Sequence, residues 1–390
     1  MKILFVNKHV NESGGIEYYI HALARRLKEK GHRIGVIHWE KVESTGNFDA
    51  RYFLPELWDD LLSLGKKTSD KLDDIIKEYS PDIVYLHNVE NGEVVAHISS
   101  RVRTVQFIHD YKIVDPDGRM LLYNPLEVNT YPLSLSCFLR AYSRRSMPRN
   151  PIKGVRAYLR AKRSLEAAKR LEKVIVASNH MKKTLVENGL EFGKISVLPY
   201  FIDYQGLRSD FKPEKKRILF SGRIMDAKGL GILIDSIGSI KRDFVLDVAG
   251  TGPMEKSCRE KAERVGLSGK VHFHGWVRHE ALPEFYRSCL FLVMPSVWPE
   301  PFGISGIEAA YFARPSIAYN VGGISDWLID GETGFLVEPY DKGKMAEKIN
   351  YLLDNPEEAE RLGRRARELA IKKYDPDLHI EKLLEIFKSL

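Results

Sequence analysis

Cysteine is scarce in this sequence, and the spacings in which cysteine usually builds structure are absent. The 390 residues include three cysteines, Cys137, Cys258 and Cys289, which lie far apart and are odd in number. No Cys-x-x-Cys pair occurs, so neither a disulfide framework nor a thiolate metal site is expected. This usage is typical of a reducing compartment, and we expect a cytoplasmic protein.

Long apolar runs and several catalytic fingerprints are also absent. No segment reaches the roughly 20 consecutive apolar residues that span a bilayer. The apolar start over residues 1–6 is too short for a signal peptide and is followed at once by polar residues. There is no Gly-x-Ser-x-Gly, and Gly229-Leu230-Gly231 lacks the spacing of a dinucleotide or P-loop motif. Serine hydrolase chemistry therefore has no support.

Positive charge is concentrated in one segment. The formal net charge is +7, whereas residues 138–173 hold twelve Lys or Arg and two Glu (12 − 2 = +10), which leaves −3 for the rest. Tyrosine and leucine lie among these cations, as in segments that dock on anionic lipid head groups. A solvated helical face is the alternative. Nucleic-acid binding is not favoured, because no recognition module accompanies the charge.

Short β-branched runs alternate with helical patterns along the whole chain, for example "KILFV", "DIVYLHN", "RILFSGRI" and "GFLVEP". This alternation predicts parallel sheets with helices on both faces. The pattern restarts after "FKPEKK". We therefore expect two α/β domains, 1–205 and 213–370, a closing helix over 371–390, and an irregular basic insertion over about 111–170. Ligands bind such folds at the carboxyl ends of the strands.

Two cations follow the first strand of the second predicted domain, in "FSGRIMDAKGLG". Arg223 and Lys228 precede a helix that opens after Gly229. A guanidinium, an ammonium and free helix N–H groups form a fitting receptor for a nucleotide diphosphate. A solvated basic loop is the alternative.

Two glutamates lie in "VWPEPFGISGIEAAYF". Glu300 is held between prolines, and Glu308 lies about one turn into the helix that starts near Ile304. The corner Phe302-Gly303 would direct free N–H groups of that helix at a ligand. A carboxylate suits the vicinal hydroxyls of a sugar, although both glutamates can also be read as surface charges.

Glycine turns and one histidine are further candidates. Gly14 and Gly15 follow the first strand, and Gly252 lies in "AGTGP" after another. Glycine allows a backbone to approach a phosphate, although most such pairs are plain turns. His109 ends the strand "TVQFIHD", where a histidine can contact a substrate or serve the structure.

Metal sites are not expected. Asp115-Pro116-Asp117 spells the Asp-x-Asp of metal-dependent sugar transferases, but Gly118 follows it and the four residues are a strong turn signal. His272 and His274 share one face of a strand without a third ligand nearby in the sequence, which favours structural packing.

Together these motifs resemble the retaining glycosyltransferases of family 4. The segment from Val297 to Asp341 resembles the donor-site block of that family, whose signature is two Glu separated by seven residues. "SGRIMDAKG" resembles its diphosphate loop, "NESGGIEYY" its N-terminal Gly-Gly loop and "FIHDY" its histidine. The motifs occur in order over almost the whole chain. One departure is Asp326, where many relatives have Glu.

The resemblance implies a GT-B fold: two Rossmann-like domains that face each other across a cleft, with a C-terminal helix that crosses back to the first domain. It implies a metal-independent, retaining hexosyltransferase without a cofactor, which uses a UDP- or GDP-sugar. The implied acceptor is a glycan, lipid-linked or small molecule in cell-surface polysaccharide or glycolipid biosynthesis, at the cytoplasmic face of the membrane. The alternatives are a soluble transferase acting on a small molecule and a catalytically silent scaffold.

The resemblance also implies roles for individual residues. Arg223 and Lys228 would hold the diphosphate, Glu308 the ribose hydroxyls and Glu300 the hydroxyls of the donor sugar. His109 would contact the transferred sugar, and the base would stack near Trp276 and Val277. The full implied set is Gly14, Gly15, His109, Arg223, Lys228, Gly252, Trp276, Val277, Glu300, Phe302, Gly303, Ile304 and Glu308.

Overall fold

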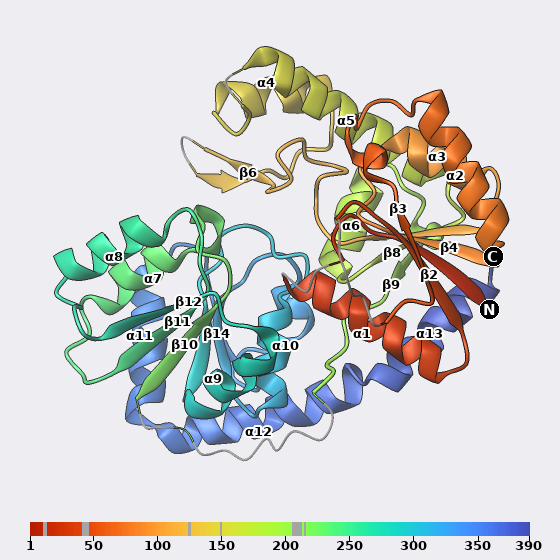
Figure 1. Ribbon diagram of the computed structural model, residues 1–390. Helices are drawn as coiled ribbons and strands as arrows, with labels where there is room; N and C mark the ends of the chain where they lie inside the picture. Colours follow the sequence, from red (N-terminus) through yellow and green to blue (C-terminus); the bar gives the residue numbers. More distant parts are fainter. Residues whose placement is uncertain (11–13, 41–46, 124–125, 149, 205–212, 214–215) are drawn as a thin grey trace. The chain divides into compact units, whose positions relative to one another are not determined.

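The chain forms two compact units in the computed structural model (Figure 1). Unit 1 comprises Met1–Phe201 and Pro376–Leu390, and unit 2 comprises Ile202–Asp375. The structure describes residues 1–10, 14–40, 47–123, 126–148, 150–204, 213 and 216–390. Most of the predicted linker, together with Ser13 of the glycine turn and Arg149 of the basic segment, lies outside these residues.

Unit 1 is built on a parallel sheet, which has seven strands within the described residues, in the order β3-β2-β1-β4-β5-β8-β9. The central strands β4 and β5 are buried along their whole length, as expected when helices cover both faces of a parallel sheet. The strands are β1 (Lys2–Val6), β2 (Arg33–His38), β3 (Ala50–Phe53), β4 (Ile83–His87), β5 (Thr104–Ile108), β8 (Lys173–Val176) and β9 (Ile195–Val197).

The helices of unit 1 connect these strands. In α1 (Gly15–Glu29) the apolar positions recur at helical spacing, so one side of the helix enters the core. The others are η1 (Pro55–Trp58), α2 (Lys66–Tyr79), α3 (Gly92–Ser99), α4 (Leu135–Ser143), α5 (Pro151–Arg170), α6 (Asn179–Glu187) and η2 (Phe192–Lys194).

The last helix, α13 (Pro376–Lys388), belongs to unit 1. It lies beside α1 in Figure 1. Lys30, which follows α1, pairs with Asp377 at 3.0 Å, and the Tyr19 hydroxyl lies 2.9 Å from His379 Nε2. The chain thus closes unit 1 with residues that follow the whole of unit 2.

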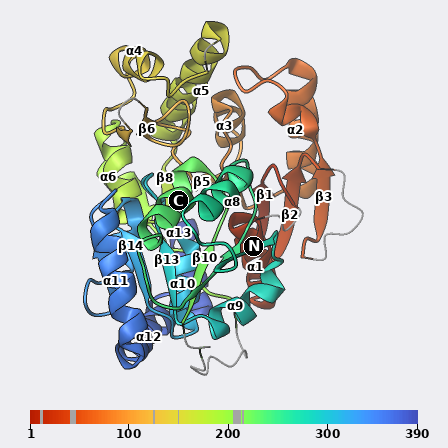
Figure 2. The same ribbon diagram turned by 90° about the vertical axis from the view of Figure 1, so that its left-hand side faces the viewer.

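The predicted insertion forms a small subassembly of its own. A short hairpin, β6 (Leu121–Leu122) and β7 (Glu127–Val128), precedes α4, and Leu122, Ala141 and Met147 form a separate apolar cluster. Figure 2 shows α4 and part of α5 projecting beyond the sheet of unit 1. The Asp115 turn is confirmed: Gly118 has φ +76° and donates its N–H to the Asp115 carbonyl at 2.9 Å.

Unit 2 repeats the architecture with a parallel sheet, six-stranded in the described part of the chain, in the order β12-β11-β10-β13-β14-β15. The predicted pair of parallel α/β sheets is therefore confirmed. The strands are β10 (Arg217–Ser221), β11 (Val245–Ala249), β12 (Val271–Gly275), β13 (Phe291–Met294), β14 (Ser316–Tyr319) and β15 (Gly334–Val337).

The helices of unit 2 follow the same alternation, and most begin just after a strand. They are η3 (Asp226–Lys228), α7 (Leu230–Ile237), α8 (Glu255–Arg264), η4 (His279–Ala281), α9 (Leu282–Ser288), α10 (Ile304–Tyr311), η5 (Gly322–Asp326), α11 (Lys342–Asp354) and α12 (Pro356–Lys373). None of the helices that the structure describes combines the length and the apolar character needed to cross a membrane.

Candidate functional site

The loops that leave the carboxyl ends of β10, β11, β13 and β14 are tied to one another. Ile224 donates its N–H to the Thr251 carbonyl at 2.9 Å, and Gly323 donates to the Glu300 carbonyl at 2.7 Å. A Cβ at Gly252 would lie 2.1 Å from the Ile224 oxygen, so this close approach requires glycine. These loops therefore pack against one another at the carboxyl edge of the sheet, which is where parallel α/β sheets bind ligands.

Lys228 and Glu300 meet on this edge. The Lys228 ammonium lies 2.7 Å from Glu300 Oε1, and the Ser296 hydroxyl donates to the same oxygen at 2.5 Å. Glu300 is only 3% exposed. A buried carboxylate destabilises the folded state unless it is paired. The contact with Lys228, which is 72 residues away in the sequence, therefore supports the fold. Arg223, on the same loop as Lys228, is exposed.

Glu308 lies in the second turn of α10 and is buried to 8% exposure. Its Oε1 accepts a hydrogen bond from the Tyr204 hydroxyl at 3.0 Å and lies 3.0 Å from His279 Nε2, and its Oε2 accepts from the Tyr286 hydroxyl at 2.9 Å. The partners of Glu308 are thus two tyrosine hydroxyls and an imidazole, whereas the partner of Glu300 is an ammonium.

The helix α10 begins at a glycine with a positive φ. Gly303 is its N-cap with φ +93°, a conformation that other residues adopt only at a cost, so the sharp Phe302-Gly303 corner depends on glycine. The Phe302 carbonyl accepts from Trp327 Nε1 at 2.7 Å, which fixes the corner. The first N–H groups of α10, beginning at Ile304, have no partner within the helix.

Trp276 and Val277 follow the end of β12. The Trp276 side chain is 56% exposed, and Val277 is partly buried. An exposed indole offers a face on which a nucleobase can stack.

The candidates from the first domain form a second group, within unit 1. Gly14 is the N-cap of α1, with an extended backbone (φ −164°), and Gly15 is its first residue. His109 follows β5 and is 1% exposed. Its Nε2 lies 3.0 Å from His87 Nδ1 and its Nδ1 lies 2.7 Å from the Tyr200 hydroxyl.

Burial governs the protonation of this histidine pair. It lowers the pKa of His87 to about 3, and burial followed by the neighbouring His87 lowers the pKa of His109 well below its ordinary value. Both rings are therefore neutral at physiological pH. Because both nitrogens of His109 are engaged, its side chain could bind a sugar hydroxyl only by exchanging one of these hydrogen bonds.

Metal-ligand sets do not form in the described ranges: no group of three or more His, Cys, Asp or Glu is arranged to hold an ion there. His274 instead pairs with Asp247 at 2.7 Å, which Arg217 also contacts at 2.6 Å. Asp117 pairs with Arg119.

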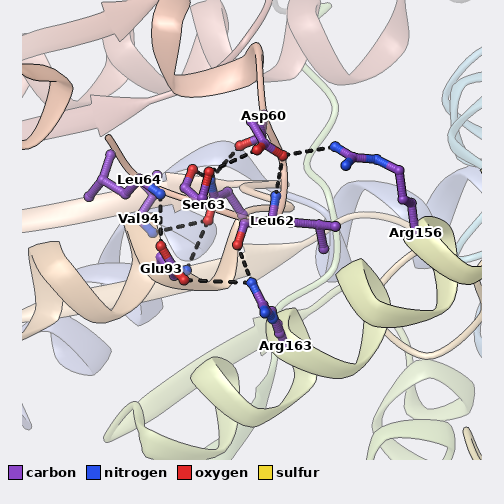
Figure 3. Close-up of polar contacts among 9 residues, drawn as sticks. Asp60, Leu62, Ser63, Leu64, Glu93, Val94, Arg156 and Arg163 are labelled. Carbon is purple, nitrogen blue, oxygen red and sulfur yellow. Dashed lines mark hydrogen bonds and ion pairs between the residues drawn. The ribbon is translucent and has the colours of Figure 1, made fainter. Parts of the chain in front are cut away.

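Carboxylates from outside the basic segment, residues 138–173, pair with some of its arginines and partly neutralise its positive charge (Figure 3). Arg156 contacts Asp60 at 3.0 Å, and Arg163 donates to the Leu62 carbonyl and lies 3.6 Å from Glu93. What stays exposed includes apolar side chains at helical spacing. They are Leu135, Leu139 and Tyr142 on α4, and Ile152, Val155 and Leu159 on α5.

Sequence reasoning missed the partners of the two glutamates. Ser296, four residues before Glu300, was within reach of a local reading. Tyr204, His279 and Tyr286 lie 104, 29 and 22 residues from Glu308, and no periodicity links them to it.

Two protein-family models match this chain. Residues 208–369 match "Glycosyl transferases group 1" and residues 13–205 match "Glycosyltransferase Family 4". The chain is 26% identical to the O-antigen chain mannosyltransferase C of Escherichia coli, over all of this chain and 99% of that protein. It is 30% identical to an alpha-D-kanosaminyltransferase of Streptomyces kanamyceticus over 44% of this chain.

The matches to several of these curated relatives span only part of their length, 45% for the kanosaminyltransferase and 34% for a D-inositol 3-phosphate glycosyltransferase of Streptomyces avermitilis. Among solved structures, the fold is similar to that of HepE from Anabaena, crystallised with UDP and glucose (TM-score 0.75, 19% identity, all of both chains). It is also similar to sucrose-phosphate synthase from Thermosynechococcus elongatus (TM-score 0.76, 18% identity, 100% of this chain and 98% of that one).

Proposed function

The chain belongs to the glycosyltransferases of family 4 and group 1, and from this premise we propose that it transfers a sugar from a UDP- or GDP-sugar to an acceptor. The transfer retains the anomeric configuration and needs no metal. The acceptor is a glycan, lipid-linked or small molecule of cell-surface polysaccharide or glycolipid biosynthesis, and the protein acts at the cytoplasmic face of the membrane.

The observation that carries this proposal is the Lys228–Glu300 pair on the ligand-binding edge of unit 2. Lys228 has further N–H donors for a diphosphate, and Arg223 is exposed on the same loop. The negative charge on the departing nucleoside diphosphate is stabilised by these two cations and by the N-terminus of α10. Lys228 thus serves two groups, the buried Glu300 and the leaving diphosphate.

The two glutamates take the two sugars of the donor. Both contacts of Glu300 fall on Oε1, so Oε2 is the oxygen offered to hydroxyls of the transferred sugar. Glu308 accepts from the ribose, and the base stacks on Trp276 beside Val277. Gly252, Phe302, Gly303 and Ile304 line the phosphates and sugar with backbone atoms.

Unit 1 supplies the remaining roles. Gly14 and Gly15 open α1 without side chains that would obstruct a phosphate or sugar. His109 contacts the transferred sugar when a sugar hydroxyl replaces the Tyr200 hydroxyl on its Nδ1. Unit 1 also determines which acceptor binds.

A thermal-shift panel with UDP, GDP, ADP and their common sugars, each with and without EDTA, tests the donor site. A ligand at 100 times its Kd stabilises the folded state by about 2.7 kcal/mol. We expect one nucleotide family to raise the Tm, independently of EDTA, and Arg223→Ala to abolish the shift. No shift with any member would contradict the donor site and turn attention to a silent scaffold.

Turnover tests the catalytic roles. With the donor identified, Glu308→Ala should abolish transfer while the protein still folds, and unchanged activity would overturn the role of Glu308. Proton NMR of the first product formed reports the anomeric configuration, and an inverted product would overturn retention.

The exposed face of α5 fits an anionic lipid surface. Ile152 is 70% exposed, Val155 44% and Leu159 36%. Lys153 lies between them in the sequence, and Lys162 follows Leu159 by three residues. An apolar stripe flanked by cations is the pattern of helices that lie in the membrane interface. Unlike Arg156, the lysines of this stretch have no carboxylate partner among the described residues.

Sedimentation with phosphatidylglycerol vesicles tests this surface. The wild type should pellet with anionic but not with phosphatidylcholine vesicles, and Ile152→Ser should weaken binding. Phe192→Ser, which removes an exposed aromatic outside the segment, is the matched control. Equal binding to both vesicle types would contradict the role of the cations, and binding to neither would leave the solvated-face interpretation.

A further inference from the structure

Glu308 is enclosed by three side-chain donors from three separate parts of unit 2. Tyr204 lies near the start of the unit, His279 begins η4, and Tyr286 lies in α9. All three reach the carboxylate at 2.9–3.0 Å. Tyr204 is 5% exposed and Tyr286 is fully buried. Such a set of buried donors on one carboxylate is a built arrangement rather than a chance surface contact.

Tyr204, His279 and Glu308 form a closed triangle. The Tyr204 hydroxyl lies 2.8 Å from His279 Nε2, and each lies 3.0 Å from Glu308 Oε1. The two rings stack at 4.9 Å with planes 14° apart, so they hold each other in place. If Nε2 carries its proton, both groups donate to Oε1.

The donors are themselves anchored. The Tyr311 hydroxyl donates to the Tyr204 carbonyl at 2.9 Å. The fully buried Arg314 donates from Nε to the Tyr286 carbonyl at 2.6 Å. Burial, and then the nearby charge of Glu308, raises the pKa of Tyr286 well above its ordinary value, so its hydroxyl stays a donor.

Tyr204, His279 and Tyr286 together form a cage around the Glu308 carboxylate. This cage differs chemically from Lys228, the partner of Glu300. An ammonium would neutralise the charge of Glu308 and compete with incoming hydroxyl groups. Three donors leave the charge in place and leave about one of the four acceptor positions of the carboxylate open. Since the Glu308 side chain is 10% exposed, that position can be reached by a ligand.

We propose that Tyr204, His279 and Tyr286 are positioning residues that fix the Glu308 carboxylate so that it accepts a hydrogen bond from one ribose hydroxyl of the nucleotide. The inference rests on the proposed function, because it presumes a nucleotide on this edge. It makes the cage the device by which the site distinguishes a ribonucleotide from a deoxynucleotide.

Isothermal calorimetry with the nucleoside diphosphate selected in the panel, and with its 2′-deoxy and 3′-deoxy forms, tests the cage. We expect the wild type to prefer the ribonucleotide over one deoxy form by about 10- to 100-fold, the size of a hydrogen bond to a charged group. Glu308→Gln should lose most of this preference. Tyr204→Phe and Tyr286→Phe should each reduce it about 5-fold or more, by weakening ribonucleotide binding alone.

Matched variants separate positioning from general damage. Tyr319→Phe removes the hydroxyl of another fully buried tyrosine of unit 2 and should leave the preference unchanged. His279→Gln, which keeps an N–H donor, should retain more of the preference than His279→Ala. Melting curves of each variant without ligand confirm that it is folded.

The outcomes are distinguishable. A wild type that binds no nucleoside diphosphate overturns the proposed function, and the cage role with it. A wild type that binds but does not discriminate between ribo and deoxy forms overturns the ribose contact. Folded Tyr204→Phe and Tyr286→Phe variants with a full preference overturn the cage alone and leave the proposed function standing.

Discussion

The two units share an architecture but bury different polar groups. In unit 1, His87 at the end of β4 and His109 stack at 5.3 Å, and His379 of α13 is buried. In unit 2 the buried polar groups at the carboxyl edge include the carboxylates of Glu300 and Glu308. The histidines avoid the cost of a buried charge by remaining neutral, whereas Glu300 avoids it by pairing and Glu308 by accepting three hydrogen bonds.

Buried neutral imidazoles and buried carboxylates differ in what they can offer a ligand. A buried imidazole that has lost its charge offers little to an anionic ligand. A buried carboxylate with fixed partners is an acceptor already oriented for hydroxyl groups, so no reorganisation is needed when a ligand arrives. The comparison therefore favours unit 2 for the hydroxyl-binding carboxylates, whereas His109 of unit 1 must exchange one of its hydrogen bonds before it can bind a sugar hydroxyl.

The largest expected effect comes from breaking the ion pair of unit 2. Lys228→Ala leaves Glu300 buried without its cation, which should cost about 3–5 kcal/mol of folding stability and abolish transfer. Urea denaturation and an activity assay measure the two losses. Arg223→Ala is the control: because it is exposed, it should lower nucleotide affinity with a change in stability of about 0.5 kcal/mol or less. Equal stability of the two variants would contradict the structural role of Lys228.

The next effect concerns acid sensitivity of unit 1. His87 and His379 have pKa values lowered to about 3 by burial, and the pKa of His109 is also lowered. The unfolded chain takes up these protons below about pH 6.5 and the folded chain does not, so stability falls as the pH falls from 6.5 towards 3. His87 and His379 should each cost about 2 kcal/mol at pH 5.

Two acids of unit 1, Asp110 and Asp115, oppose this trend, because burial raises the pKa of each. Burial raises the pKa of Asp115 to about 6, so its protonation in the folded state returns about 1 kcal/mol at pH 5. Denaturation midpoints between pH 7.5 and 5 should still fall, and His379→Gln should make the slope shallower. A wild type with a flat profile would contradict the assignment of neutral imidazoles.

A smaller effect contrasts the two helix-opening glycines. Gly303→Ala places a side chain at φ +93° and should cost about 1–2 kcal/mol. Gly14→Ala keeps an ordinary extended backbone, and its Cβ would meet mainly the mobile end of Glu17, so it should be nearly neutral. Thermal denaturation of both variants measures the contrast. Similar losses would show that the strain at Gly303 has been overstated.

The smallest effect is expected at the surface of α5. Arg156 and Asp60 pair with side chains that are 57% and 45% exposed, and such pairs contribute about 0–1 kcal/mol. Arg156→Ala should therefore shift the Tm by no more than a few degrees. A large loss would indicate that the contacts in Figure 3 hold α5 in place and are not merely a solvated ion pair.

The sequence predicted the core strands but not every strand. Buried runs such as those of β1 and β4 are continuous and β-branched, so they could be recognised without the fold. The edge strand β3 alternates between half-buried and exposed positions, and β6 and β7 are two residues each, too short for a pattern. Predicted strands also ran too far: "RILFSGRI" ends at Ser221, because Gly222 turns with φ +154°.

By itself the sequence determined the alternation of strands and helices, the restart that gives two units, and the positions of the glycine corners and charged side chains, since these are local properties of the chain. Only the tertiary structure decided which side chains meet. It paired Lys228 with Glu300, enclosed Glu308 with Tyr204, His279 and Tyr286, and buried His109 against His87 and Tyr200. The physical reason is that hydrogen bonds and ion pairs act over a few ångströms, and residues far apart in a sequence reach that distance only when the sheet brings its loops to one edge.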